Sequence, residues 1–163
     1  MPIQRILLTC SLLVASLSGV LGLKMKAIAQ PDKVSVTIYD RGKQLNLAAD
    51  VAAVQELVSR CEAQMRTADT MLKLAVTPQL IANLRRQEVT IEIRYSQPQT
   101  FIISFNGQTV EPMRILIPLT GEFAQGVTTI FYGRDQYAHG PYRNSQGQHE
   151  ISTVVAKLGI QVD

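Results

Sequence analysis

The chain has 163 residues, and its 16 Lys and Arg against 13 Asp and Glu give a formal charge of +3 and a pI near 9.0. The excess lies entirely in residues 1–29, which contain Arg5, Lys24 and Lys26 and no acidic residue, so residues 30–163 carry 13 charges of each sign. Such a neutral domain lacks the positive surplus that phosphate backbones attract, which excludes a nucleic-acid partner bound through bulk charge.

The first 29 residues have the pattern of an export sequence. An uncharged apolar run from Ile6 to Leu23 follows Arg5 and precedes Ala27-Ile28-Ala29. A positive start, an apolar middle and a small-x-small end are typical of a signal peptide, here cleaved before Gln30. At about 1.5 Å per residue the run also spans roughly 27 Å, enough for an uncleaved membrane anchor. Either alternative predicts an extracytoplasmic domain that is periplasmic, secreted or held at the membrane through residues 6–23.

The domain that follows begins with a strand and a long helix. Apolar and polar residues alternate over residues 34–39, and Asp40-Arg41-Gly42 predicts the turn that ends this strand. A stripe at spacings of three and four then predicts a helix over residues 47–66. The apolar residues of the stripe are Leu47, Val51, Val54, Val58, Cys61 and Met65.

Cys61 is the only cysteine of residues 30–163, since Cys10 lies in the apolar run. No intramolecular disulfide is therefore predicted within the domain. Its place on the apolar stripe predicts a buried, unreactive thiol. The alternative role is an intermolecular disulfide.

The middle of the chain changes from helical to strand periodicity. Residues 71–76 fit either a helix or a short strand, and Thr77-Pro78 predicts the capped start of a short helix that ends near Arg86. Alternation then predicts a series of strands, and Asn106-Gly107 predicts a hairpin turn. The predicted strands cover residues 89–95, 101–105, 108–119 with an interruption at Glu111-Pro112, and 127–132.

The last part of the chain is predicted as a polar loop over residues 133–148 and a final helix. Ile151, Val154, Val155 and Leu158 form the apolar side of this helix, and Gly159 ends it. Successive strands joined by short turns pair antiparallel, and helices cover a face that is apolar. The sequence therefore predicts one α+β domain over residues 30–163, with an antiparallel meander sheet of about four to five strands and helices on one face.

A Tyr-, Arg- and His-rich segment at residues 132–145 is the strongest candidate binding site. Tyrosine and arginine dominate binding surfaces because they combine large contact area with polar ends, and long loops often carry function. The predicted ligand-binding residues are Tyr132, Arg134, Tyr137, His139, Tyr142 and Arg143. In the alternative reading the tyrosines cover the sheet edge, and the arginines pair with Asp135 and Glu150.

Catalytic patterns are missing from the sequence. It has no GxSxG, no phosphate-binding P-loop and no GxGxxG after a strand. His139 and His149, with Asp135 and Glu150, supply enough ligands for a metal, but their spacing fits no metal-binding pattern, so we predict neither a metal nor a cofactor.

Three functions remain open. The preferred one is a non-catalytic module of the cell envelope that binds an unknown protein or small ligand through residues 132–145. The second is a small exported hydrolase or metal-dependent enzyme that uses His139 or His149. The third is a membrane-anchored accessory subunit, in which residues 6–23 stay in the bilayer.

Overall fold

The described part of the chain, residues 34–162 of a computed structural model, combines nine β-strands with three α-helices and a 3-10 turn, η1 (Glu122–Ala124). The strands are β1 (Val34–Asp40), β2 (Lys43–Leu47), β3 (Thr70–Met71), β4 (Val89–Tyr95), β5 (Phe101–Ile102), β6 (Thr109–Val110), β7 (Arg114–Pro118), β8 (Thr128–Gly133) and β9 (Tyr142–Asn144). The helices are α1 (Ala52–Arg66), α2 (Pro78–Gln87) and α3 (His149–Lys157).

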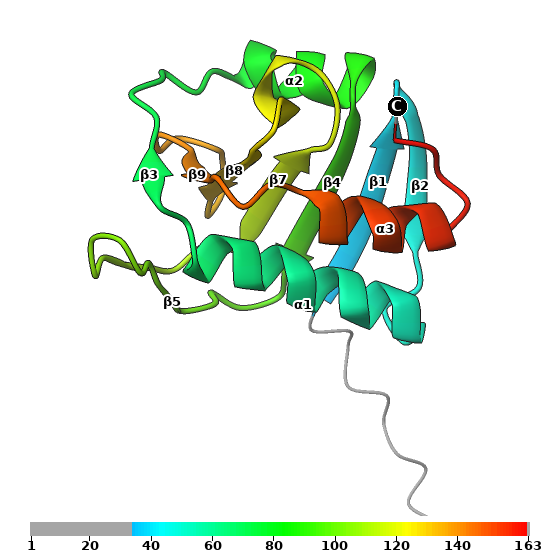
Figure 1. The fold of residues 1–163 in the computed structure, drawn as a ribbon, viewed down its shortest axis with the longest axis horizontal. Helices are drawn as coiled ribbons and strands as arrows, with labels where there is room; N and C mark the ends of the chain where they lie inside the picture. The colour runs from blue at the N-terminus through cyan, green and yellow to red at the C-terminus, as the bar shows by residue number, and fades with distance from the viewer. Residues whose placement is uncertain (1–33, 163) are drawn as a thin grey trace, which may run out of the picture.

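Seven of the strands form one antiparallel sheet, in the order β2-β1-β4-β7-β8-β9-β3 (Figure 1). Strands β5 and β6 pair with each other in a separate small sheet. The predicted α+β class and antiparallel sheet are confirmed. The predicted number of strands is too low, because β2 and β9 were not anticipated and residues 71–76 were left open between a helix and a short strand.

Strand register gathers the apolar residues of the sheet on one face. Ile93 of β4 lies opposite Val36 of β1 and Ile115 of β7, and Ile115 in turn lies opposite Tyr132 of β8. Because neighbouring residues of a strand point to opposite faces, Glu92 and Leu116 lie on the other side. The sheet therefore has one nearly continuous apolar face and one mixed face.

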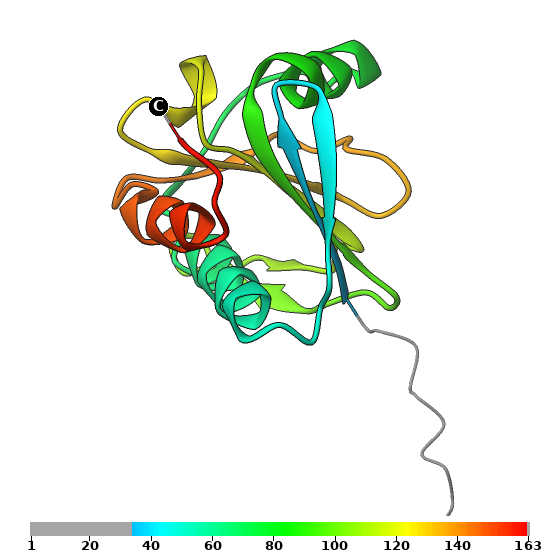
Figure 2. The ribbon, with the colours of Figure 1, turned by 90° about the vertical axis from the view of Figure 1, so that its right-hand side faces the viewer.

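Helices α1 and α3 lie side by side over the apolar face (Figure 2). Arg60 of α1 pairs with Glu150 of α3 at 2.7 Å, which joins the exposed sides of the two helices. Helix α2 packs on the opposite face, where Ile81 and Leu84 contact the cluster that contains Leu116. The prediction that all helices lie on one face is therefore wrong for α2.

The first helix starts later than its apolar stripe predicts. Leu47 ends β2, which forms a hairpin with β1 through Arg41 and Gly42, both at positive φ of 47° and 92°. Such a turn matches the twist of antiparallel strands. Helix α1 begins at Ala52, and its inner face includes the fully buried Leu57, which the stripe does not contain.

The other elements follow their sequence signals closely. Thr77 caps α2, its side chain accepting a hydrogen bond from the Leu80 backbone N–H at 3.1 Å, and Pro78 is the first helical residue. Gly159 follows α3 at a positive φ of 82°. The predicted strand at residues 101–105 is shorter, since only Phe101 and Ile102 pair.

The export sequence predicted over residues 1–29, with its alternatives of signal peptide and anchor, lies outside the described residues. Between residues 34 and 162, none of the helices combines the length and apolarity needed to cross a bilayer.

Cys61 is fully buried between α1 and the sheet, as predicted. Burial raises the pKa of its thiol far above the usual value, and the neighbouring Glu62 carboxylate adds to the effect. In a chain that carries Cys10→Ser, we expect Cys61 to react with an aromatic disulfide reagent only in denaturant, because only unfolding exposes the thiol and allows it to ionise.

The control for this measurement is an added Met71→Cys, at a side chain that is 44% exposed. The introduced thiol should react rapidly in buffer while Cys61 remains protected. Equal rates at both positions in buffer would contradict the burial of Cys61.

Candidate binding site

The segment predicted to bind, residues 132–145, is not one loop. Tyr132 lies in β8 and Tyr142 in β9, and Tyr137 makes an isolated β-bridge with Gly133. All three tyrosines are buried, with 6%, 0% and 7% of Tyr132, Tyr142 and Tyr137 exposed. This burial agrees with the alternative interpretation, in which the tyrosines pack on the sheet edge, because little of each side chain is left exposed to a ligand.

A stack of aromatic rings holds the segment against the core. The Tyr132 ring stacks on Tyr142, with centroids 5.2 Å apart, and on His139, with centroids 5.4 Å apart. Burial raises the pKa of Tyr132, and so does its hydrogen bond with Tyr142. The Tyr142 hydroxyl donates to Gln108 Oε1 at 2.8 Å and so ties the stack to the β5–β6 hairpin.

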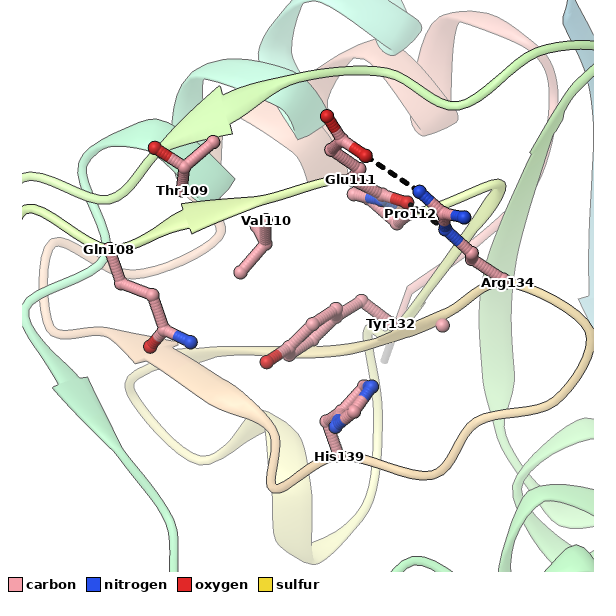
Figure 3. A pocket seen from close by; sticks show the side chains of 9 residues that line it. Gln108, Thr109, Val110, Glu111, Pro112, Tyr132, Arg134 and His139 are labelled. Carbon is pink, nitrogen blue, oxygen red and sulfur yellow. Dashed lines mark hydrogen bonds and ion pairs between the residues drawn. The ribbon is translucent and has the colours of Figure 1, made fainter.

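A pocket of about 410 Å³ lies between this hairpin and the start of the 132–145 segment (Figure 3). Tyr132, Arg134 and His139 line one side, and Gln108 to Pro112 line the other. Arg134 Nη2 and Glu111 Oε2 meet at 2.6 Å, and Arg134 Nε donates to the Glu111 carbonyl oxygen at 3.2 Å. The pocket therefore offers imidazole, amide, hydroxyl and paired charged groups from two segments far apart in the chain.

Three of the six predicted binding residues thus meet at one pocket, and the other three do not line it. Arg134 and His139 are exposed, whereas Tyr142 lies behind the pocket wall. Arg143 is half-buried in β9 between Thr70 and Thr129 on the neighbouring strands, and its buried Nε has no hydrogen-bond partner among residues 34–162.

The opposite wall of this pocket, residues 108–112, was not predicted as part of a site. Asn106-Gly107 predicted the hairpin, but turn chemistry says nothing about which distant segment a hairpin packs against. The alternative pairing of the arginines is wrong for Arg134, whose carboxylate partner is Glu111. Glu150 instead pairs with Arg60.

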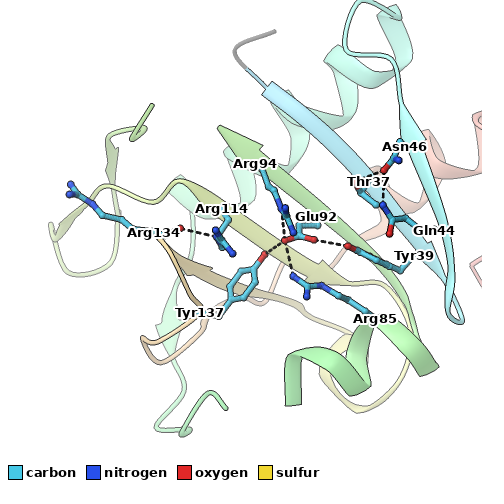
Figure 4. A network of polar contacts seen from close by, with 10 residues as sticks. All are labelled: Thr37, Tyr39, Gln44, Asn46, Arg85, Glu92, Arg94, Arg114, Arg134 and Tyr137. Atoms are coloured by element: carbon cyan, nitrogen blue, oxygen red, sulfur yellow. Dashed lines mark hydrogen bonds and ion pairs between the residues drawn. The ribbon is translucent and has the colours of Figure 1, made fainter. Parts of the chain in front are cut away.

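Tyr137 belongs to a different site, on the mixed face of the sheet. Glu92 is 1% exposed at the centre of this site (Figure 4). Its Oε1 accepts hydrogen bonds from Arg85 at 2.8 Å, Arg94 at 3.0 Å and the Tyr137 hydroxyl at 2.9 Å. Its Oε2 accepts from the Tyr39 hydroxyl at 2.9 Å. We call these five residues the Glu92 cluster.

The Glu92 cluster keeps a buried carboxylate ionised. Burial by itself raises the pKa of Glu92, but the Arg94 hydrogen bond, the charge of Arg85 and the two tyrosine hydroxyls outweigh it and lower the pKa below the usual value. Burial also raises the pKa of Tyr137, and the neighbouring Glu92 charge raises it further, so the phenol stays a hydrogen-bond donor.

The two histidines do not form a joint site. His139 stacks on Tyr132, while His149 is the exposed first residue of α3 and does not line the pocket. Among residues 34–162, no three His, Cys, Asp or Glu side chains gather closely enough to hold a metal ion. The Ser145 hydroxyl donates to Asp69, and neither histidine side chain makes a hydrogen bond within this range.

Comparison of the chain with protein-family models, curated proteins and solved structures gives no match. Function must therefore be inferred from the residues themselves.

Removal of the Glu92 charge should destabilise the domain strongly. We expect Glu92→Gln to lower the free energy of unfolding by about 1.5–3 kcal/mol, because the neutral amide replaces a buried carboxylate that accepts charge-assisted hydrogen bonds from Arg85 and Arg94. Denaturant titration measures this loss. The matched control is Glu111→Gln, which breaks an exposed pair and should cost about 0–1 kcal/mol. Equal losses in the two variants would contradict a central role for Glu92.

The stability difference between the wild-type protein and Glu92→Gln should also depend on pH. Because the folded-state pKa of Glu92 is lowered, its stabilising contribution is complete above its unfolded value and is lost as the pH falls through the folded value. The stability difference between wild type and Glu92→Gln should therefore be constant near neutral pH and shrink in acid. A difference that grows as the pH falls would show that the pKa is raised instead.

Proposed function

We propose that this protein is a non-catalytic binding module of the cell envelope, and that the pocket between the β5–β6 hairpin and the 132–145 segment holds its ligand. The observation that carries the proposal is the convergence of Tyr132, Arg134 and His139 with Gln108 and Glu111 around one open cavity. Small-ligand sites are concave and combine aromatic surface with a few fixed polar groups. The bound species is a small polar molecule or a polar segment of a partner protein.

The geometry of the pocket suits binding better than hydrolysis. The Arg134–Glu111 pair and the Tyr142–Gln108 hydrogen bond fix the polar groups in place, and fixed groups bind with less loss of conformational entropy. Nucleophilic catalysis needs a nucleophile hydrogen-bonded to a base, and His139 has no such partner within residues 34–162. The hydrolase alternative therefore gains no support from this pocket.

The choice of residues to replace follows from their burial. Tyr137 and Tyr142 are poor test positions, because alanine at a buried aromatic costs about 3–5 kcal/mol and would impair folding itself. Arg134 and His139 are exposed, so Arg134→Ala with His139→Ala should remove pocket groups and leave stability nearly unchanged.

For this double variant we expect at least a tenfold loss of affinity for whatever the wild-type protein binds. A suitable assay is quantitative capture from detergent-solubilised envelope extract, together with native mass spectrometry for small ligands. The matched control is Arg86→Ala with His149→Ala, two exposed residues of the same types outside the pocket. The control should bind like wild type, whereas a loss shared by both variants, or by neither, would overturn the proposal.

Export of the domain is the second part of the proposal, and it rests on the charge and apolar pattern of residues 1–29. We expect the mature protein to begin at Gln30, and N-terminal sequencing with intact-mass measurement would show this. A chain that keeps residues 6–23 and fractionates with membranes would instead support the anchored accessory subunit. Full-length protein recovered only from the cytoplasm would contradict both.

A further inference from the structure

The mixed face of the sheet carries more positive charge than its buried acid neutralises. Strand register places Arg94 of β4 directly opposite Arg114 of β7, and α2 adds Arg85 on the same face. Like charges on directly opposed residues destabilise a sheet. The Glu92 carboxylate compensates only part of this repulsion, since one negative charge faces three guanidinium groups.

Glu92 also has little capacity for another donor. A carboxylate has about four lone-pair positions, and Glu92 already accepts four hydrogen bonds. Within residues 34–162 Arg114 has no ion-pair partner, and its side chain makes one hydrogen bond, from Nε to the Arg134 carbonyl oxygen at 2.8 Å. Arg85 Nε is buried and has no acceptor in the same range. Both arginines therefore retain unused donors.

A small cavity lies where these two arginines meet. It measures about 160 Å³ and is lined by Arg85, Arg114 and Tyr137, with Pro78 and Ile81 of α2 as an apolar wall. Asp135 and Gln136 complete the lining. The volume is roughly five times the ~30 Å³ that a water molecule occupies in the liquid. A carboxylate with a few attached carbon atoms fits this space.

The guanidinium groups are held in position before any ligand arrives. The carbon at the centre of each guanidinium, Cζ of Arg85 and Cζ of Arg114, lies 5.8 Å from the centroid of the Tyr137 ring. The Tyr137 hydroxyl is fixed by Glu92, so one ring orients two cations. Preorganised arginines suit bidentate recognition of a planar oxyanion.

We propose that this cavity, between α2 and β7, binds a carboxylate group that carries a short apolar substituent. Arg85 and Arg114 donate to the carboxylate oxygens, and Pro78 and Ile81 contact the substituent. The Asp135 carboxylate at the same cavity reduces the net positive charge, which disfavours a doubly charged phosphate more than a singly charged carboxylate. This site is separate from the pocket of the proposed function, and neither Arg134 nor His139 lines it.

The test is a titration of the full chain with 3-methylbutanoate, followed by NMR of the arginine Nε–H groups. We expect a saturable shift of the Arg85 and Arg114 signals with a dissociation constant in the millimolar range. N-acetyl-alanyl-alanine and its C-terminal amide form the second arm and separate a free small acid from a peptide C-terminus as the source of the carboxylate. Tighter binding of the peptide acid than of both its amide and 3-methylbutanoate assigns the site to chain ends, and tighter binding of 3-methylbutanoate assigns it to a free small acid. Inorganic phosphate is the third probe, and tighter binding of phosphate than of either carboxylate would overturn the proposed class.

Substitutions then assign the binding to this cavity. Arg114→Gln removes donors from the cavity without touching Glu92, and should weaken carboxylate binding about tenfold or more. The matched control is Arg86→Gln, which removes the same charge from the helix that carries Arg85 but is exposed and does not line the cavity, and should change the affinity less than twofold by loss of long-range charge alone. Asp135→Asn should tighten binding, because it removes a repelling charge.

Three further results would overturn the inference: no saturable shift with either carboxylate, equal weakening by Arg114→Gln and Arg86→Gln, or weaker binding in Asp135→Asn. Unfolding by denaturant provides the folding control. Arg114→Gln should unfold near the wild-type midpoint, since Arg114 makes no contact with the Glu92 carboxylate. If Arg114→Gln fails to fold, Arg114→Lys keeps the charge and loses the planar fork, and a wild-type affinity in that variant would also count against the site.

Discussion

One buried carboxylate, Glu92 of β4, joins its own strand and the preceding helix α2 to β1 and to the segment beyond β8, which lie 53 and 45 residues away in sequence. Its oxygens accept from Tyr39 in β1, Arg85 in α2, Arg94 in β4 and Tyr137 beyond β8. An ionised carboxylate loses several kcal/mol of hydration when it is buried, so it is stable only while its partners remain in place. The position of α2 on the sheet, and the path of the chain after β8, are therefore constrained by this one side chain.

The two faces of the sheet differ in the same way: one is covered by packed helices, and the other carries the polar cluster around Glu92. The face under α1 and α3 is apolar across neighbouring strands, as Ile91 and Ile93 in β4 illustrate, and it is occupied by helix packing. The opposite face alternates with it residue by residue and presents Glu92 and Arg94 instead. Helix α2 covers only part of that face with Ile81 and Leu84. Polar groups that are free to bind therefore gather beside α2 and along the edge formed after β8.

Sequence periodicity was sufficient where an element carries its own signal, as in the alternation of β4 and the Thr77-Pro78 start of α2. It failed where pairing depends on a distant partner. Leu47 fits the helical stripe by spacing alone, yet it ends the hairpin strand β2, and β9 forms inside a polar segment because β8 and β3 lie on either side of it. The Tyr, Arg and His content of residues 132–145 singled out a segment that supplies one wall of the larger pocket. This composition did not show that Tyr137 belongs to a different site from Arg134 and His139. The position of Tyr137 depends on its hydrogen bond to Glu92, 45 residues away in sequence.

Arg134 is the point where the two candidate sites touch, and the chemistry of that contact keeps them independent. Its side chain lines the larger pocket and pairs with Glu111, while its backbone carbonyl oxygen accepts from Arg114. Replacement of the Arg134 side chain removes a group from the first site but leaves the carbonyl that supports Arg114 in the second. Replacement of Arg114 leaves the Arg134–Glu111 pair in place. Loss of binding at one site with retention at the other would therefore identify which of the two a ligand occupies, even though Arg134 lines the first site and its carbonyl oxygen supports Arg114 at the second.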